Sequence, residues 1–451
     1  MRCLLSLAVA TAAAFITTSL AAPIVVNPGG KGDLIVTAHN TINGSSQVLV
    51  DNSTAPSSPL KLSLVNNFGG KQLNAYVTGQ DTKGSIVMLS TNGSWYYPNP
   101  AGSASPVAID AQVALPLKGK GEKTELTLPD YISSGRIWIA DGELQFFTVA
   151  SATGAPQLVE PSAANPSDPS AAINWGFVEL TNTEEGGIYA NISFVDFVGL
   201  IMGMSLTLGS GEVQTVQGLS GDAIKSICSD LKDQAAKDGQ PWDEMCVTDA
   251  SGNPLRVMAP NLYLASHAGA MEDYYDDYNN KVWEKYSSTK LTIDTQTDAG
   301  KVTCQVDGDQ LKCDGDNRGY PKPTVADIWG CNSGPFAILN DKMVHSTAFG
   351  IQDDDNDVHR AIVPRLCAAF TRSTLLIDGG DVQPSSSVGS DTYYKNDPTN
   401  HYSRIVHKYE VDGKGYAFSY DDVNPDGQNE AGVVSGPNPQ TLELTIGGPS
   451  S

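Results

Sequence analysis

Two acidic residues interrupt apolar, strand-like sequence between residues 175 and 199, which read WGFVELTNTEEGGIYANISFVDFVG. Glu179 lies in the first apolar run, Asp196 lies in the second, and a Glu-Glu-Gly-Gly corner joins the runs. This pattern predicts a β-hairpin. Two carboxyl groups on neighbouring strands can cleave a glycosidic bond, one as a protonated general acid and the other as an ionised general base. The alternative is that both acids simply face solvent.

Side-chain alternation decides whether the two carboxyl groups share a face of the hairpin. With the turn centred on Glu185 and Gly186, Glu179 lies opposite Ile192, and Asp196 falls on the same face four residues further along. That offset is about 13 Å along a strand, which is long for a catalytic pair. A longer turn or a β-bulge would shorten it, and a one-residue slip would put the acids on opposite faces.

Aromatic residues surround the two acids. They are Trp175, Phe177, Tyr189 and Phe194. Aromatic rings can stack on sugars, but on strands they usually pack against neighbouring side chains, so packing is the expected role of most of them. If Glu179 is the acid, we expect burial beside Trp175 or Phe177 to raise its pKa, and we expect Asp196 to stay ionised.

The elements that must position these residues differ along the chain. Residues 23 to about 210 contain short alternating runs separated by turn residues, which predicts an antiparallel β-sandwich or barrel. Beyond residue 215 we expect helices within 220–239, 270–289, 333–342 and 358–376, and strands within 290–296 and 301–306. The final β-like runs are 405–420 and 441–447.

A chain of 451 residues is longer than one hydrophobic core usually serves. We expect a signal peptide at 1–21, a β domain at 22–212 and a mixed α/β domain at 213–375. The C-terminal β segments, 376–451, are expected to return to the groove or to the β domain. The fold class is therefore mainly β with an added α/β domain.

The N-terminus is typical of a secretory signal peptide, because Arg2 precedes an apolar run from Leu4 to Ile16 and then small residues. The run is too short to span a membrane. Cleavage is predicted after Ala21, since cleavage one residue later would leave Pro23 first. We therefore expect a secreted, extracellular protein.

The formal net charge is −23, and it becomes −24 when Arg2 is removed with the signal peptide. So acidic a chain has no basic footprint for nucleic acid and little attraction to anionic membranes. Its acidity favours solubility through self-repulsion.

Six cysteines remain after the signal peptide, and an even number in a secreted chain predicts three disulfides with fifteen possible connectivities. Loop length alone suggests the nearest-neighbour pairs Cys228–Cys246, Cys304–Cys313 and Cys331–Cys367. Zinc is the weaker alternative because no CxxC spacing occurs and histidine is scarce.

Sequons predict glycosylation at Asn43, Asn52 and Asn92, which lie in Ser/Gly-rich sequence. A fourth sequon, at Asn191, lies in the second hairpin arm, and its use would require the side chain to face outward.

The acidic stretches 307–319 and 352–360 lack the full ligand set of a calcium loop, so solvated turns are expected there. No HExxH, GxSxG or phosphate-loop motif occurs. We expect no metal and no cofactor.

The hairpin resembles glycoside hydrolase family 64, the β-1,3-glucanases with a thaumatin-like domain. Further segments resemble the same family in the same order: SGRIWIADGELQFF (134–147), NPSDP (165–169), YYDDYNNKVWEKYS (274–287), ADIWGCNSGPF (326–336), RLCAAFTRSTLL (365–376) and KGYAFSYDDV (414–423). The resemblance therefore covers nearly the whole mature chain.

The resemblance implies a thaumatin-like β-barrel or sandwich, a wide groove between it and the α/β domain, and β-1,3-glucan as the bound polysaccharide. It also implies an inverting mechanism with Glu179 as acid, Asp196 as base and a sugar contact at Thr181. The family commonly has Trp-Asp where this chain has Trp175-Gly176, and the turn is one residue longer here. Of the aromatic residues near the two acids, Trp175 is taken as the candidate for substrate binding.

Asp421 and Asp422 resemble an acidic-cleft segment of thaumatin-like proteins and are candidates to line the groove, although solvated turn acids are equally compatible. The chain is expected to act as a monomer. A glucan-binding protein without catalysis, and a structural surface protein with solvated acids, are the alternative functions.

Overall fold

The computed structural model describes residues 23–43, 60–69, 72–339, 346–347, 350–351 and 355–448. The predicted signal peptide and the sequon at Asn52 lie outside these residues. The described part of the chain is mainly β and contains several sheets, as the alternating runs predict.

The largest sheet carries the predicted hairpin and has eight strands. Seven lie in the spatial order β27 (Val434–Gly436), β14 (Gly187–Ile192), β13 (Trp175–Thr183), β10 (Ile132–Asp141), β4 (Leu73–Gln80), β5 (Ile86–Leu89) and β6 (Trp95–Tyr96). The eighth, β8 (Leu115–Pro116), pairs with β4.

A second sheet of five strands packs against one face of the first. Its order is β17 (Val213–Val216), β16 (Met202–Leu208), β28 (Pro439–Ile446), β3 (Lys61–Asn66) and β9 (Lys123–Thr127). Buried side chains at alternate positions of both sheets belong to one core; they include Leu64, Val77, Ile137, Val178, Leu206 and Leu444. The period of two in the sequence thus produces a β-sandwich.

The C-terminal strand β28 lies inside this second sheet, parallel to β3 and antiparallel to β16. The preceding strand β27 pairs with β14 of the hairpin. The last two strands of the described residues therefore complete the sandwich that β3 and β4 begin.

Three smaller sheets and a strand pair complete the β structure. One is β1 (Ile24–Val25), β18 (Cys246–Thr248), β19 (Pro254–Met258) and β15 (Phe197–Val198), and another is β2 (Thr41–Asn43), β12 (Pro156–Val159), β11 (Phe147–Ala150) and β7 (Val107–Ala108). The third is β23 (Gly319–Pro321), β22 (Gln310–Cys313), β21 (Lys301–Asp307), β20 (Leu291–Asp294) and β26 (Val382–Gln383), and the pair is β24 (Ser346–Thr347) with β25 (Gly350–Ile351).

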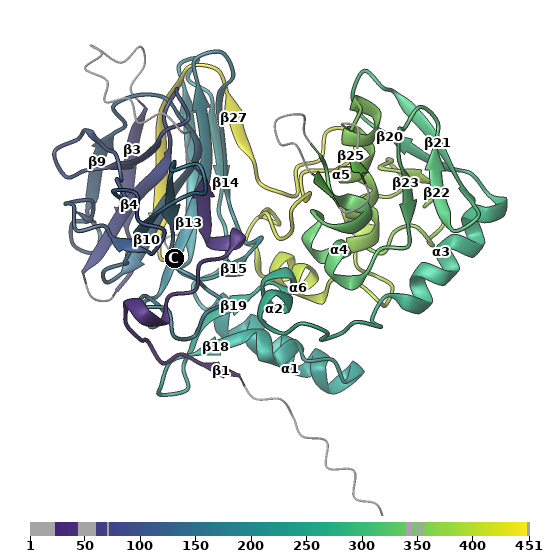
Figure 1. Ribbon diagram of the computed structural model, residues 1–451, viewed down its shortest axis with the longest axis horizontal. Coiled ribbons are helices and arrows are strands. Elements are labelled where there is room, and N and C mark those ends of the chain that lie inside the picture. The colour runs from purple at the N-terminus through teal and green to yellow at the C-terminus, as the bar shows by residue number, and fades with distance from the viewer. Residues whose placement is uncertain are drawn as a thin grey trace, which may run out of the picture.

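The α-helices of the described residues are α1 (Ala223–Asp238), α2 (Pro260–Ser266), α3 (Asp276–Ser288), α4 (Val325–Gly330), α5 (Asp357–Thr371) and α6 (His401–Tyr409). Three of the helix predictions are confirmed by α1, α3 and α5. In Figure 1 the sandwich lies on the left, and α3, α4 and α5 lie on the right with β20 to β23.

Two secondary-structure predictions are wrong. The run beginning at Ile405 is not a strand but the second half of α6, because Tyr402, Ile405 and Val406 form a helical stripe that is fully buried. The expected helix at 333–342 is reduced to a single 3₁₀ turn at Gly334–Phe336, with the described residues ending at 339.

The six cysteines form three disulfides, and the nearest-neighbour hypothesis is confirmed. Cys228 and Cys246 join α1 to β18, and Cys304 and Cys313 join β21 to β22. Cys331, at the end of α4, is bonded to Cys367 of α5. Disulfides of this number fit an oxidising compartment.

The two predicted acidic turns are not fully solvated. The side chains of Asp316 and Asp355 are buried. Asp316 contacts the buried His359 at 3.1 Å, and Asp355 pairs with Arg318. These acids stabilise the packing of β23 against α5.

None of the helices among the described residues is both long and apolar enough to cross a membrane. The same residues contain no group of three or more His, Cys, Asp or Glu side chains that could hold a metal ion.

Candidate active site

One face of β13 changes from apolar to polar along the strand. Trp175, Phe177, Glu179 and Thr181 alternate on this face. The first two are buried, whereas Glu179 and Thr181 are half-buried. The acid therefore stands where an aromatic core gives way to an open surface.

Trp175 does not lie where the sequence analysis expects a substrate contact. Its side chain is 1% exposed, and its ring lies 5.7 Å from that of Phe197. The guanidinium carbon of Arg256 lies 3.8 Å from the centroid of the Trp175 ring on another side. Core packing, the ordinary role of a strand aromatic, is the role of Trp175.

The hairpin register differs by one residue from the predicted register. Glu179 lies opposite Asn191 rather than Ile192, and Thr183 opposite Gly187 closes the turn. Extending this register would send Asp196 to the other face. However, β14 ends at Ile192, and the chain bends at residues 195–196 before β15. The bend breaks the alternation and returns the Asp196 side chain to the side of Glu179.

A pocket of about 700 Å³ contains both acids. One wall comes from β10, β13, β14 and the bend, and the other comes from the segment between α6 and β27. The lining residues are Arg136, Glu179, Tyr189, Asn191, Val195, Asp196, Tyr416, Ser419, Asp422, Asn429, Val433 and Ser435. A second pocket of about 370 Å³ shares Arg136, Glu179, Tyr189 and Asn191 with the first and adds Thr181. The two together make an elongated surface.

The sequon at Asn191 thus lies inside the pocket, directly across from Glu179. A glycan on Asn191 would occupy this space. The other two described sequon residues, Asn43 at the end of β2 and Asn92 in a turn, are exposed.

Arg136 of β10 is the cross-strand neighbour of Glu179 and binds two carboxylates. Its Nη2 donates to Oε1 of Glu179 at 3.1 Å, and its Nη1 donates to Oε2 of Glu160 at 2.6 Å. Its guanidinium carbon also lies 4.5 Å from the centre of the Phe177 ring. The orientation of Glu179 therefore depends on a cation that the sequence analysis missed.

Glu160 is buried, and its support is continuous with the sheet. Thr78 donates its hydroxyl to Oε1 of Glu160 at 3.3 Å, and the Trp138 indole donates to Thr78 at 3.0 Å. Burial raises the pKa of Glu160, while Arg136 and Thr78 act in the opposite direction. The buried Glu160 carboxylate therefore holds the Arg136 guanidinium in place.

Asp196 is half-buried at the bend, and burial raises its pKa. Arg136 counteracts this increase, the negative charge of Glu179 adds to it, and His39 and a hydrogen bond from Asn261 lower the pKa. The sequence analysis expects Asp196 to stay ionised; burial opposes ionisation because the pocket removes water from its carboxyl group, and Arg136, His39 and Asn261 favour it.

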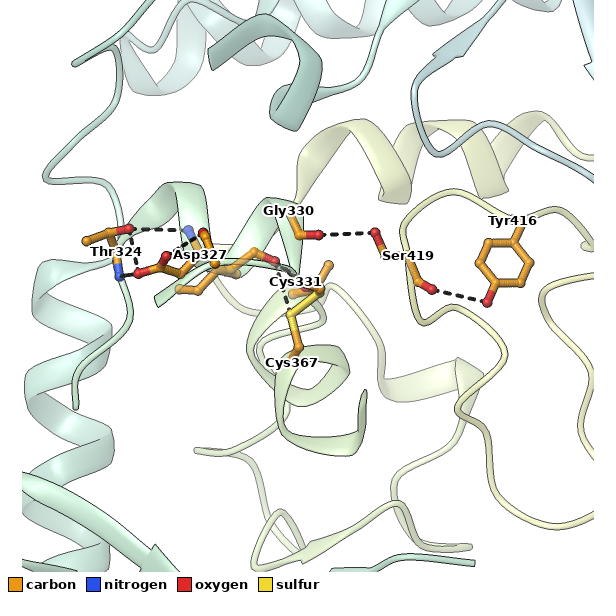
Figure 2. Close-up of a disulfide and its surroundings, with 10 residues drawn as sticks. Thr324, Asp327, Gly330, Cys331, Cys367, Tyr416 and Ser419 are labelled. Atoms are coloured by element: carbon orange, nitrogen blue, oxygen red, sulfur yellow. Dashed lines mark hydrogen bonds between the residues drawn. A yellow bond between two sulfur atoms is a disulfide. The ribbon is translucent and has the colours of Figure 1, made fainter. Parts of the chain in front are cut away.

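The opposite wall is attached to a disulfide-bonded pair of helices. The Tyr416 hydroxyl donates to the carbonyl oxygen of Ser419 at 3.1 Å, and the Ser419 hydroxyl donates to the carbonyl oxygen of Gly330 at 3.2 Å. Gly330 precedes Cys331, which is bonded to Cys367 (Figure 2). This chain of contacts links the pocket to α4 and α5.

The two walls also meet at the base of the pocket. The backbone N–H of Phe194 donates to the carbonyl oxygen of Tyr416 at 2.8 Å, and Ser193 forms a β-bridge with Tyr416. The Tyr402 hydroxyl of α6 donates to the carbonyl oxygen of Phe194 at 2.6 Å. The bend that carries Asp196 is therefore fastened from both sides.

Asp421 and Asp422 have different environments although they are adjacent. Asp422 is exposed and lines the pocket. Asp421 is fully buried, accepts from Nη2 of Arg372 at 2.8 Å and contacts Nε2 of His407 at 3.0 Å. The expectation that Asp421 lines the groove is therefore wrong, because its carboxylate serves the core.

His407 bridges two buried carboxylates, since its Nδ1 lies 2.8 Å from Glu410. Although burial alone would lower it, Glu410 and Asp421 raise the pKa of His407 well above its usual value. Burial would raise the pKa of Asp421, but His407 and Arg372 lower it. This buried charge cluster, Arg372, His407, Glu410 and Asp421, holds the segment that forms the second wall.

The chain belongs to glycoside hydrolase family 64. Residues 58–446 match this family, which is described as "Beta-1,3-glucanase". The conclusion agrees with the resemblance carried by the hairpin and the segments downstream of it.

Curated relatives include the glucan endo-1,3-beta-glucosidases of Cellulosimicrobium cellulans and of Arthrobacter sp. (strain YCWD3). Each is 24% identical over 402 residues, which is 87% of this chain and 66% of the relative. The chain therefore spans just under two thirds of the length of these relatives.

Solved structures show the same fold. A laminaripentaose-producing β-1,3-glucanase in complex with laminaritetraose is 26% identical, with a TM-score of 0.72 over 86% of this chain and 98% of that one. A family 64 β-1,3-glucanase domain from Clostridium beijerinckii is 20% identical, with a TM-score of 0.65 over 88% of this chain and 100% of that one.

Proposed function

We propose that this protein is a secreted β-1,3-glucan hydrolase that works by inversion, with Glu179 as general acid and Asp196 as general base. The observation that carries the proposal is that both carboxyl groups open into one pocket in a chain of family 64. The division of roles follows the residue-by-residue resemblance of the hairpin to the family.

The proposed reaction needs one water molecule and no cofactor. Asp196 takes a proton from water, whose oxygen bonds to the anomeric carbon on the face away from the leaving sugar. The glycosidic C–O bond breaks as Glu179 gives its proton to the leaving oxygen. Exchange with solvent then returns the proton from Asp196 and reprotonates Glu179.

Arg136 constrains the position of Glu179 in this reaction. Its Nη2 lies 3.1 Å from Oε1 of Glu179, so it fixes where the proposed acid stands relative to the leaving oxygen.

The elongated surface suits a polymer. Tyr189 is 59% exposed between the two pockets and offers an aromatic face, with Thr181 opposite it on β13. Thr181 and Asp422 are proposed to contact glucan hydroxyl groups. The β-sandwich supports the thaumatin-like domain that the resemblance implies, and we propose that the groove runs between the sandwich and the segment of residues 410–433. The protein is proposed to act as an extracellular monomer.

The test is the release of reducing sugar from laminarin by the wild type and by Glu179→Gln. We expect hydrolysis to be lost in the variant while laminarin binding remains. Glu184→Gln, an exposed neighbour in the hairpin turn, is the matched control and should behave as the wild type. A wild type that binds laminarin without cleaving it would replace the proposal by the glucan-binding alternative.

A further inference from the structure

The N-terminal segment, residues 23–43, lies outside the part of the chain that matches the family, yet it is built into the candidate site. Its strand β1 pairs with β18, and the Val26 N–H donates to the carbonyl oxygen of Thr248 at 3.0 Å. Its strand β2 pairs with β12. In Figure 1 this purple segment leaves β1 and runs across the front of the molecule towards the hairpin.

A short 3₁₀ turn, Ala38–Asn40, fixes the segment beside Arg136 and Glu160. The Thr37 N–H donates to the Asn40 side chain at 2.8 Å, and the Asn40 amide donates to the carbonyl oxygen of Ile35 at 3.0 Å. The Asn40 carbonyl accepts from the backbone N–H of Glu160 at 2.8 Å. The residue before Asn40 is His39, whose side chain is exposed.

His39 and Asp196 both line a small cavity of about 20 Å³. Arg136 and Asp196 line both this cavity and the main pocket, so they form the partition between the two. Glu160 and His39 add further polar groups to the cavity, together with buried apolar neighbours such as Phe177 and Phe197. A polar cavity of this size has room for one water molecule.

The charges around this partition do not balance. Arg136 interacts with three carboxylates, those of Glu160, Glu179 and Asp196. Among the described residues, Tyr402 of α6 also interacts with Asp196 and is uncharged as a hydroxyl donor, and Asn261 contributes only a hydrogen bond. One guanidinium among three carboxylates leaves a negative site, and a second cation there would stabilise ionised Asp196.

We propose that His39 is a positioning residue of the active site, whose protonated imidazole faces Asp196 across the small cavity and keeps this carboxyl group ionised for its role as base. The proposal rests on the proposed function. A cation beside Asp196 opposes the burial that raises the pKa of this carboxyl group, so its effect falls on the acidic limb of the activity profile, where a base is lost by protonation.

The experiment compares pH profiles of kcat/KM on laminarin for the wild type and His39→Gln. Loss of the cation should move the acidic limb to higher pH by about 0.5–1 unit, which is a loss of about three- to tenfold on that limb. Activity on the alkaline side should be unchanged. His39→Lys, which keeps a positive charge, should restore the acidic limb.

Lys31→Gln is the matched control, since it removes one positive charge from an exposed position of the same segment outside the cavity. Equal thermal unfolding of all variants would separate positioning from folding. An active His39→Gln enzyme whose acidic limb coincides with that of the wild type would overturn the role of His39 alone. Absence of hydrolysis by the wild type would instead overturn the proposed function.

Discussion

The two walls of the pocket hold their polar side chains by different means. Glu179 stands on β13, whose backbone pairs with β10 and β14 along its length. Asp422 stands in a segment between α6 and β27 that has few backbone pairs and depends on the buried charge cluster beneath it. The wall formed by β10, β13, β14 and the bend, here called the sheet wall, is positioned by backbone hydrogen bonds. The wall formed by the segment between α6 and β27, here called the segment wall, is positioned by buried side chains.

This difference predicts which substitutions affect catalytic activity and which affect the stability of the fold. On the sheet wall, a polar side chain can be changed while the backbone hydrogen bonds remain, so we expect large effects on activity and small effects on folding. On the segment wall, the buried charges carry the fold itself, so adjacent acids should respond in opposite ways.

The largest effect is expected on the sheet wall. Asp196→Asn should lower kcat on laminarin by about 10²–10⁴-fold, because the amide cannot take a proton from water. Thermal unfolding should change little, since Asp196 lies at a half-buried bend. Steady-state kinetics with Asp298→Asn, an exposed acid, as control would check this; a variant that keeps more than a tenth of wild-type activity would rule out Asp196 as the base.

In the segment wall, replacing Asp421 should destabilise the protein far more than replacing Asp422. Asp421→Ala leaves Arg372 and His407 buried without their shared carboxylate, and such losses cost about 3–5 kcal/mol. Asp422→Ala, at an exposed site, should change stability by less than about 0.5 kcal/mol. Urea unfolding of the two variants measures the contrast, and equal midpoints would refute it.

The charge cluster should also make stability depend on pH. Because folding raises the pKa of His407, its contribution is complete below about pH 6.5 and is lost as the pH rises towards the folded-state pKa. Because folding lowers the pKa of Asp421, its contribution is lost below about pH 3.8. Stability should therefore decline above about pH 6.5, and His407→Gln should flatten that decline. An unchanged slope would mean that His407 does not titrate with unfolding.

The smallest effect is expected at Thr181. Thr181→Ala should raise KM for laminarin about two- to tenfold with little change in kcat, the loss of about one neutral hydrogen bond to the substrate. Thr183→Ala, near the hairpin turn, offers a comparison outside the two pockets. A fall in kcat without a change in KM would assign Thr181 to the chemical step instead.

The strands and acids of the sheet wall can largely be predicted from the sequence, because side-chain alternation along a strand is a local pattern. Alternation of apolar residues predicts a sandwich, and it makes Glu179 and Asp196 conspicuous as acids in apolar runs. The same rule could have found Arg136, a single cation inside the apolar run that forms β10. What alternation could not reveal is the bend at residues 195–196, because the preceding Phe194 is held by Tyr416, which lies more than two hundred residues away in the sequence.

The segment wall was harder to predict. Two adjacent aspartates look alike in sequence, and only long-range contacts with α5 and α6 bury Asp421 and leave Asp422 exposed. The helix α6 was hidden for a similar reason, since its buried stripe is short and reads equally well as a strand. Glu160 and His39 join the site through tertiary contacts that no local pattern encodes.

The most direct measurement identifies the anomeric form of the product that is released first. Proton NMR monitors this product during the hydrolysis of laminarin-derived oligosaccharides. Two carboxyl groups that act on opposite faces of the sugar, with a water molecule between base and anomeric carbon, predict that the α-anomer accumulates first and then mutarotates. Initial release of the β-anomer would contradict this account, because it would require one of the two carboxylates to bond to the sugar.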